Sequence, residues 1–343
     1  MVNTNRLTVG IISYNRPLQL LRTLKSLLPL PLDVEVIICD DKSPKIIEIS
    51  NSINEILRNN KNIHFIQNEI NIGYDKNVFN VIERSNTDYV LLLGDDDYLE
   101  TNALENLQRF FSNTKNFTCG FLRYKSDSDN KYSRLNSTDI YFDKSIIKSN
   151  GSFIYNSILF SGLIFKKSTI VNHKEILEKY FNSIYIQFAI FLLLHSKYGS
   201  YGISGPGIII GGDGESGFGF NDASSNLDAD LKDRTSIISN LAYHKRLFDV
   251  VNKMELDISQ EIVSPFIFEY KIRCVKAIFI ARKYGRKYLK NYWKSLKKIN
   301  INGIWMIVPF YLLIYISPLF ILNWPIGIIE VMIMKYRKIK QIS

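Results

Sequence analysis

Residues 88–97 read Asp-Tyr-Val-Leu-Leu-Leu-Gly-Asp-Asp-Asp, a run of strand-forming residues that ends in three consecutive carboxylates. In open α/β folds, acids at the carboxyl end of a buried strand lie at the sheet edge where ligands bind. Adjacent carboxylates repel one another unless a cation lies among them, and hard divalent cations prefer carboxylate oxygen. The stretch therefore predicts a metal or ligand site at Asp95, Asp96 and Asp97, with a solvated acidic turn as the alternative.

The residues around this stretch alternate between strand-like and helix-like patterns. Pro17 suits the first turn of a helix that follows the first strand. Such alternation predicts an α/β fold with a Rossmann-like, doubly wound and mostly parallel sheet. Strands are expected over 7–13, 34–39, 62–67, 88–93, 117–124 and 158–166. Helical segments are expected over 17–28, from after Asp41 to about residue 59, and over 75–86, 168–197 and 226–298.

Length and composition are those of a folded protein. The 343 residues have room for two domains, and 46% of them are hydrophobic. Cys39, Cys119 and Cys274 are far apart and form no CxxC pair, which disfavours a zinc site or a disulfide framework. The apolar run after the N-terminus is too short for a signal peptide, so we expect a protein that stays in the cytoplasm.

Positive charge is concentrated at the C-terminal end. From Arg282 to Ser343 there are twelve Lys or Arg and one acid, Glu330, which amounts to +11 against +10 for the whole chain. Residues 1–281 are therefore near neutral. A charge distribution of this kind indicates an anionic surface as a partner.

The basic tail also contains an apolar segment. Residues 304–334 hold a single charge, but prolines 309, 318 and 325 divide them, so in-plane helices or a re-entrant hairpin compete with a membrane span. Residues 282–298 before it form a basic helix with an aromatic face, which is typical of a bilayer interface. The alternative is a hydrophobic C-terminal helix packed on its own domain or on a dimer partner. A nucleic-acid partner is disfavoured because the apolar segment follows directly.

Polar residues follow each of the first four strands. Because carboxyl ends of parallel strands share one sheet edge, we expect these groups to converge. Taken singly, each has a structural explanation as a turn residue or a helix cap. The groups are Ser13-Tyr14-Asn15-Arg16, then Asp40-Asp41, then Asn71-Ile72-Gly73-Tyr74 with Asn77, and finally the acid triplet.

At these positions the first 110 residues resemble the nucleotide-binding half of a family 2 glycosyltransferase of the GT-A fold. The resemblance is carried by Val9–Asn15, Val36–Ser43, Asn71-x-Gly73-x-x-x-Asn77 and Leu93–Asp97. The Gly-Asp-Asp-Asp variant is similar to abequosyltransferase-like members that build bacterial O-antigens. The resemblance implies a nucleotide-sugar donor and transfer to a polyprenyl-diphosphate-linked saccharide at the cytoplasmic face of the inner membrane, in O-antigen or capsule synthesis.

The resemblance also implies roles for individual residues. Asp41 would hydrogen-bond the nucleobase, and Asp95 would face the ribose or sugar. Asp96, with Asp97, would hold Mg²⁺ or Mn²⁺ against the diphosphate, where the metal neutralises the charge of the leaving group. The remaining residues of the donor pocket would be Tyr14, Asn15, Asn71, Gly73 and Asn77.

Inversion at the sugar carbon needs a general base, which in many members is part of a Glu-Asp pair at the start of a helix. Here that stretch is residues 184–188, Ile-Tyr-Ile-Gln-Phe, without a carboxylate. The nearest conspicuous acids downstream are Asp213 and Glu215 in a glycine-rich segment, and these are the candidate catalytic residues. An ordinary acidic surface loop is the alternative. His195, among leucines, is expected in the core.

We expect a GT-A domain over residues 1–225, with a nucleotide-sugar half (1–115) and an acceptor half (116–225). A helical region over 226–303 and a membrane-associated tail over 304–343 would follow. Two other functions are alternatives. A nucleotidyltransferase would need a glycine-rich N-terminal loop, but Gly10 is the only glycine before Gly73. A non-catalytic membrane scaffold with a degenerate transferase fold is favoured by the missing Glu-Asp pair and disfavoured by the intact acid triplet.

Overall fold

The computed structural model describes residues 7–31, 33–126, 132, 138–211, 237–298 and 303–317. The chain divides into two compact units. Unit 1 comprises Met1–Lys144 and Asn156–Phe220, and unit 2 comprises Ser145–Tyr155 and Asn221–Ser343.

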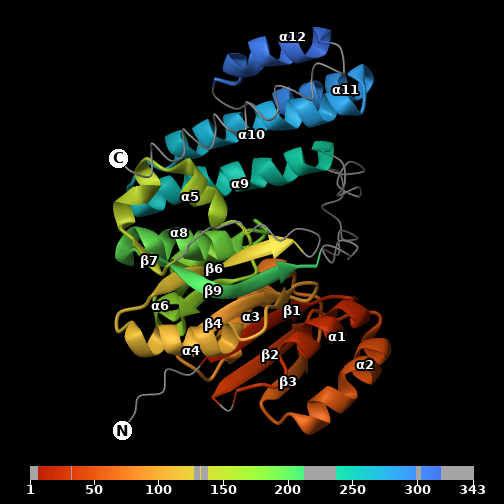
Figure 1. The fold of residues 1–343 in the computed structure, drawn as a ribbon, viewed down its shortest axis with the longest axis vertical. Coiled ribbons are helices and arrows are strands. Elements are labelled where there is room, and N and C mark those ends of the chain that lie inside the picture. Colours follow the sequence, from red (N-terminus) through yellow and green to blue (C-terminus); the bar gives the residue numbers. More distant parts are fainter. Residues whose placement is uncertain are drawn as a thin grey trace. The chain divides into compact units, whose positions relative to one another are not determined.

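Unit 1 is built on one mixed sheet (Figure 1). Within the described residues its strands lie in the order β3-β2-β1-β4-β8-β6-β9-β5, and β7 pairs with β9. The first four strands of the sequence pair with one another in parallel, as expected. These strands are β1 (Leu7–Ser13), β2 (Val34–Asp40), β3 (Ile63–Gln67) and β4 (Tyr89–Gly94).

The expectation of a mostly parallel sheet is wrong for the second half of unit 1. Strand β8 (Leu163–Lys166) runs antiparallel to both β4 and β6 (Cys119–Ser126). Strand β9 (Ser200–Ile210) is parallel to β6 but antiparallel to β5 (Tyr98–Leu99) and β7 (Ile140–Phe142). Strand direction depends on the connection, and the regular strand–helix–strand crossovers end at β4.

Helices cover both faces of the sheet. On one face, Leu20 of α1 and Ile53 of α2 join Val9 and Ile11 of β1 in the main hydrophobic core, together with Leu107 of α4. On the other face, α3 packs on β1 and β2, and α8 packs on α3, β6 and β8. Successive strand residues point to opposite faces, so the continuous apolar runs of β1, β2 and β4 supply both cores. The helices are α1 (Pro17–Ser26), α2 (Ile46–Asn59), α3 (Tyr74–Arg84), α4 (Ala103–Asn113), α6 (Lys167–Val171), α7 (Lys174–Glu178) and α8 (Ile186–Tyr198).

Gly10 sets the distance between α3 and the sheet. A Cβ atom at this position would lie 2.3 Å from Cγ1 of Val81 and 3.2 Å from Cγ1 of Val90. No side chain fits in that space, so a glycine here lets α3 approach β1 closely. The approach matters for the site because α3 begins at the polar edge of the sheet.

Unit 2 consists of helices. Helix α10 (Val263–Lys283) contacts α9 (Ile237–Ile258), α11 (Arg286–Lys298) and α12 (Val308–Ile316). The short helix α5 (Gly151–Asn156) contributes Tyr155, whose ring stacks on Phe266 with a centroid distance of 4.7 Å. Two arginines bind the last carbonyls of α12: Arg286 Nε donates to Tyr315 O and Arg282 Nη2 to Ser317 O, both at 3.2 Å. Positive charge at a helix C-terminus is favourable.

Part of the aromatic face of the basic segment packs within unit 2. Leu289, Tyr292, Trp293 and Leu296 of α11 are buried, whereas Tyr284 just before α11 is 72% exposed. The contact of this segment with a bilayer stays a prediction. The lysines of α11 remain exposed. In the part of the chain that the structure describes, no helix combines the length and the apolar character that crossing a membrane requires.

Candidate functional site

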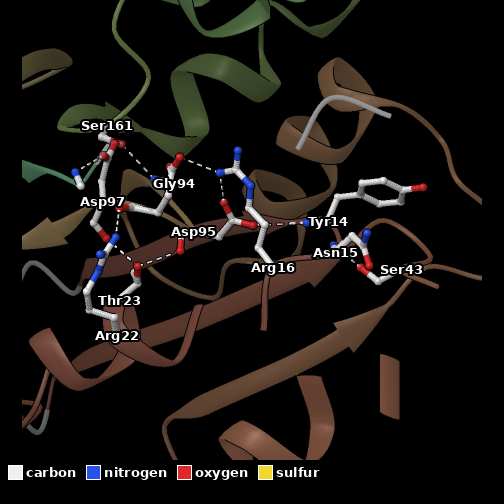
Figure 2. A network of polar contacts seen from close by, with 12 residues as sticks. Tyr14, Asn15, Arg16, Arg22, Thr23, Ser43, Gly94, Asp95, Asp97 and Ser161 are labelled. Carbon is white, nitrogen blue, oxygen red and sulfur yellow. Dashed lines mark hydrogen bonds and ion pairs between the residues drawn. The ribbon is translucent and has the colours of Figure 1, made fainter. Parts of the chain in front are cut away.

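The ends of three parallel strands bring the predicted polar groups together. Ser13 at the end of β1 is in register with Asp40 of β2, and Ile12 is in register with Gly94 of β4. The turn after β1 and the acid triplet after β4 therefore lie side by side, as Figure 2 shows. This confirms that the groups converge on one sheet edge.

Asp95 is buried and paired with an arginine. Its Oδ1 lies 3.0 Å from Nη1 of Arg16, and its Oδ2 accepts the backbone N–H of Tyr14 at 3.3 Å. Burial raises the pKa of Asp95 to about 7, and the Arg16 guanidinium limits the rise. In Figure 2 the ring of Tyr14 points away from this carboxylate. Asp95 therefore forms an internal ion pair.

Asp97 faces the opposite way. Its Oδ2 accepts a short hydrogen bond from Ser161 Oγ, and its Oδ1 accepts the N–H of Gly211 at 3.1 Å. Burial raises the pKa of this carboxyl to about 6, with the charge of Asp96 adding to the rise. Both oxygens are thus occupied by protein donors. These contacts favour a structural role for Asp97. Its role as a metal ligand stays a prediction.

Asp96 is the most accessible acid of the triplet. Its side chain is 25% exposed, against 9% for Asp95. Its Oδ2 lies 2.6 Å from Nη1 of Arg16, the same nitrogen that contacts Asp95. One guanidinium nitrogen therefore bridges two neighbouring carboxylates.

Helix α1 holds the backbone of the triplet. Thr23 Oγ1 donates to the carbonyls of Asp95 (2.9 Å) and Asp97 (2.6 Å). Arg22 Nη2 donates to the carbonyl of Asp96 at 2.6 Å. The side chains of α1 thereby fix the turn that directs the three acids in different directions.

A second turn is ordered by Asp40 and Ser43. Asp40 accepts the backbone N–H of Ser43 at 2.8 Å and a short hydrogen bond from its hydroxyl, and Ser43 Oγ accepts the N–H of Asn15 at 2.7 Å. Asn15 adopts a left-handed conformation, with φ 62°. Asn tolerates this conformation better than most residues. The chain thus positions Tyr14 and Arg16 on either side of a fixed turn.

Asp41 holds the loop after β3. Its Oδ1 accepts the N–H of Ile72 (2.8 Å) and Nδ2 of Asn68 (2.9 Å), and its Oδ2 accepts the N–H of Gly73 (2.9 Å). Asn77 is buried, and its Nδ2 donates to Cys39 O at 2.9 Å. Gly73, with φ 83°, supplies the turn into α3, and the exposed Asn71 accepts its N–H at 3.1 Å. The structure thus brings these predicted residues together, and their contacts within the protein shape the loop.

The start of α8 has no carboxylate of its own. A buried carboxylate of α3, Asp75, binds the backbone there. Asp75 accepts the N–H of Ile184 at 2.9 Å and that of Ile186 at 3.2 Å. Burial raises the pKa of Asp75 to about 6, and the backbone hydrogen bonds limit the rise. Asn182 and Ile184 have φ 68° and 64°. Left-handed geometry is strained for a β-branched residue, so Asp75 stabilises an unusual loop.

The two candidate bases, Asp213 and Glu215, lie outside the described residues, and their role stays a prediction. Gly211, two residues before Asp213, is described and bonded to Asp97. His195 is buried in α8, and its Nδ1 lies 2.9 Å from Ser200 Oγ. As expected, it is a core residue.

The described residues of this site fit a metal that is shared with a ligand. Magnesium in nucleotide sites is usually held by one or two carboxylates together with substrate phosphates. Among the described residues, no three or more His, Cys, Asp or Glu side chains form a cluster able to hold a metal by themselves. Asp96 offers a partly exposed carboxylate for shared coordination. The residues therefore fit a metal bound jointly with a diphosphate ligand, not a preformed protein cage.

A parallel half-sheet with acids and a helix-held turn at its edge is the kind of place where open α/β folds bind ligands. Residues 8–181 match the family model described as glycosyl transferase family 2, so the chain belongs to this family and is a glycosyltransferase. None of the curated protein sequences compared with the chain matches it significantly.

Solved structures show the same fold. The structure of S. aureus TarS 1–349 in complex with UDP matches with a TM-score of 0.52 and 12% identity, over 90% of each chain. The corresponding complex with UDP-GlcNAc matches with a TM-score of 0.50 and 14% identity, also over 90% of each chain. At such identities the likeness concerns the fold alone.

Proposed function

We propose that the protein transfers a sugar, with inversion, from a nucleotide-sugar donor to a lipid-linked saccharide at an anionic membrane surface. The observation that carries this proposal is the acid triplet at the shared edge of β1, β2 and β4, with Asp96 accessible beside Arg16. In open α/β folds this edge is where ligands bind. A diphosphate at this position would meet both a carboxylate for a shared metal and a guanidinium.

The donor would lie along the three turns of this edge. Asp41, with Asn71, Gly73 and Asn77, would shape the nucleobase side, and Tyr14 and Asn15 would line the same pocket. A uridine nucleotide is the first donor to test, because the TarS structures contain UDP and UDP-GlcNAc. Asp95 would position the ribose side through its ion pair.

The metal would be Mg²⁺ or Mn²⁺, held by Asp96 together with the diphosphate. When bound, it supplies Lewis acidity that stabilises the departing nucleoside diphosphate. Asp97 is the predicted second ligand, but its hydrogen bonds to Ser161 and Gly211 support a role in holding the turn. The proposal therefore rests on Asp96.

The general base would come from Asp213 or Glu215. Support comes from Gly211, which binds Asp97 and so brings the chain to the donor site immediately before these acids in the sequence. Asp75, the buried acid at the start of α8, is unsuited to the role because its carboxylate is bonded to backbone N–H groups.

The proposal of a membrane-bound acceptor is supported by the surface of unit 2. Trp305, Phe310, Leu313 and Ile316 of the α12 region are 45–69% exposed, and the lysines of α11 are exposed as well. Apolar side chains near a basic helix are typical of proteins that bind the interface of anionic bilayers. A polyprenyl-linked acceptor would be reached there. This is consistent with a place at the cytoplasmic face of a bacterial inner membrane, in O-antigen or capsule synthesis of the abequosyltransferase-like type.

Donor turnover tests the proposal. The protein would be incubated with UDP-, GDP-, CDP- and dTDP-sugars and Mn²⁺, and release of the nucleoside diphosphate would be measured. One donor class should be consumed, and Asp96→Asn should lower that rate at least about 100-fold, in line with the loss of an electrostatic stabiliser. The control is Asp88→Asn, an exposed acid just before β4 at its opposite end. Equal rates in Asp96→Asn and the wild type would refute the metal role.

A further inference from the structure

Arg16 already occupies the position beside Asp96 that a metal would need. The residue lies at the N-cap of α1 and is 8% exposed. Its Nη1 lies 3.0 Å from Asp95 Oδ1 and 2.6 Å from Asp96 Oδ2. The site therefore contains its own cation.

This cation makes the site less favourable for a free metal ion. A divalent ion that approaches Asp96 Oδ2 competes with the guanidinium for the same oxygen. It also comes within a few ångströms of a fixed positive charge, and the partly buried setting weakens the screening by water. Asp95 offers no replacement, because its Oδ1 is bonded to the same nitrogen. The arrangement therefore disfavours binding of the metal alone.

A diphosphate reverses this balance. Its negative charges offset the repulsion between metal and arginine, and guanidinium groups bind phosphate oxygens well through paired N–H donors. Arg16 would stay anchored on the buried Asp95 while a phosphate oxygen replaced its contact with Asp96. Asp96 Oδ2 would then be available to hold a metal.

We propose that Arg16 is a built-in counterion of the donor site that gives up Asp96 only when a nucleoside diphosphate arrives, so that metal and nucleotide bind together. Arg16 is thus a positioning residue for the acid triplet and a direct contact for the diphosphate. This inference rests on the proposed donor site and adds an order of binding to it.

The test is calorimetric titration with MnCl₂ alone, and with MnCl₂ plus UDP, GDP, CDP or dTDP. For the wild type we expect weak binding of Mn²⁺ alone and clear binding of one nucleotide with Mn²⁺. In Arg16→Gln, binding of Mn²⁺ alone should become at least tenfold tighter, and binding of the nucleotide with Mn²⁺ at least tenfold weaker. If Arg16 only stabilised the fold, Arg16→Gln would not bind Mn²⁺ more tightly than the wild type.

Lys25→Gln is the matched control. Lys25 lies on α1, the helix that Arg16 caps, and carries the same charge, but its side chain is exposed. Its loss should leave the affinity for Mn²⁺ alone within about twofold of the wild type. An equal gain in both variants would overturn the inference, because the effect would then reflect net charge.

Loss of Arg16 leaves Asp95 buried without its partner, which destabilises proteins strongly. If Arg16→Gln does not fold, the pair Asp95→Asn and Arg16→Gln/Asp95→Asn replaces it, since both neutralise the buried acid and only one retains the arginine. The double variant should bind Mn²⁺ alone at least tenfold more tightly than Asp95→Asn. Equal affinities overturn the inference. A wild type that binds no nucleotide with Mn²⁺ instead refutes the donor site itself.

Discussion

Asp95, Asp96 and Asp97 are adjacent in the sequence and have three different environments. Asp95 is buried against Arg16, Asp97 is bonded to Ser161 and Gly211, and Asp96 is partly exposed. Sequence reasoning could locate the triplet, because a strand that ends in acids has a clear pattern. It could not tell the acids apart, since their partners come from other segments of the chain.

Asp41 is the residue whose structural role is most readily measured. It accepts three hydrogen bonds, from Asn68, Ile72 and Gly73, at 2.8–2.9 Å. Asp41→Ala removes the charged acceptor of all three donors, and a hydrogen bond to a charged group contributes about 1.5–3 kcal/mol. Asn68 Nδ2 and the N–H of Gly73 keep their second acceptors, Asn77 and Asn71. The free energy of unfolding should therefore fall by at least about 2 kcal/mol, measured by chemical denaturation. Lys42→Ala, an exposed neighbour, should change it by less than about 0.5 kcal/mol.

If Asp41→Ala unfolds with the wild-type free energy, the loop does not depend on this carboxylate. The acid would then be available for the nucleobase contact that the family resemblance implies. The measurement thus separates the two roles assigned to the residue.

At the scale of elements, the first half of unit 1 could be predicted closely. Strands expected at 7–13, 34–39, 62–67 and 88–93 occur at Leu7–Ser13, Val34–Asp40, Ile63–Gln67 and Tyr89–Gly94. Apolar runs bounded by turn residues have one clear interpretation. The direction of β8 could not be predicted, because it depends on the connection that precedes the strand and not on the strand's own residues.

The packing of α3 on β1 gives a second prediction. Gly10→Ala would place a Cβ atom 2.3 Å from Val81 Cγ1, so we expect the free energy of unfolding to fall by about 1–3 kcal/mol through overpacking. Val81→Ala removes the clashing methyl groups. The double variant Gly10→Ala/Val81→Ala should therefore be less destabilised than the sum of the two single variants.

Additive effects in this double-mutant cycle would contradict the close approach of α3. The measurement is denaturant unfolding of the four proteins, followed by a comparison of their midpoints and slopes. Because α3 begins at Tyr74, directly after the Gly73 turn, the position of α3 on the sheet also affects the proposed donor site.

At the scale of the whole molecule, the chain combines a transferase unit with a helical unit. The basic C-terminal region could be recognised from charge and hydropathy alone. Its packing could not: Tyr292 and Trp293 of α11 are buried while Tyr284 is exposed, and further exposed apolar residues lie on α12 and the turn before it. Periodicity identifies an amphipathic helix without indicating what covers its apolar face.

Vesicle co-sedimentation tests the proposed membrane contact. Leu312→Ser/Leu313→Ser should weaken binding to both anionic and neutral vesicles. Lys287→Glu/Lys294→Glu should weaken binding to anionic vesicles only, by at least about tenfold, since each basic residue near such a surface contributes about 1 kcal/mol. Leu256→Ser is the control, because Leu256 is 79% exposed but lies on α9. Unchanged binding in both double variants would show that these helices are not the contact.

The central claim is that Asp96 and a shared metal bind a nucleoside diphosphate at the edge of β1, β2 and β4. The most direct measurement is calorimetric titration of UDP, GDP, CDP and dTDP into the wild type and Asp96→Asn, with and without Mn²⁺. We predict that one nucleotide binds, that Mn²⁺ strengthens the binding at least tenfold, and that Asp96→Asn abolishes this gain. Folded protein that binds none of the four, or an Asp96→Asn variant with the full metal effect, would contradict the account.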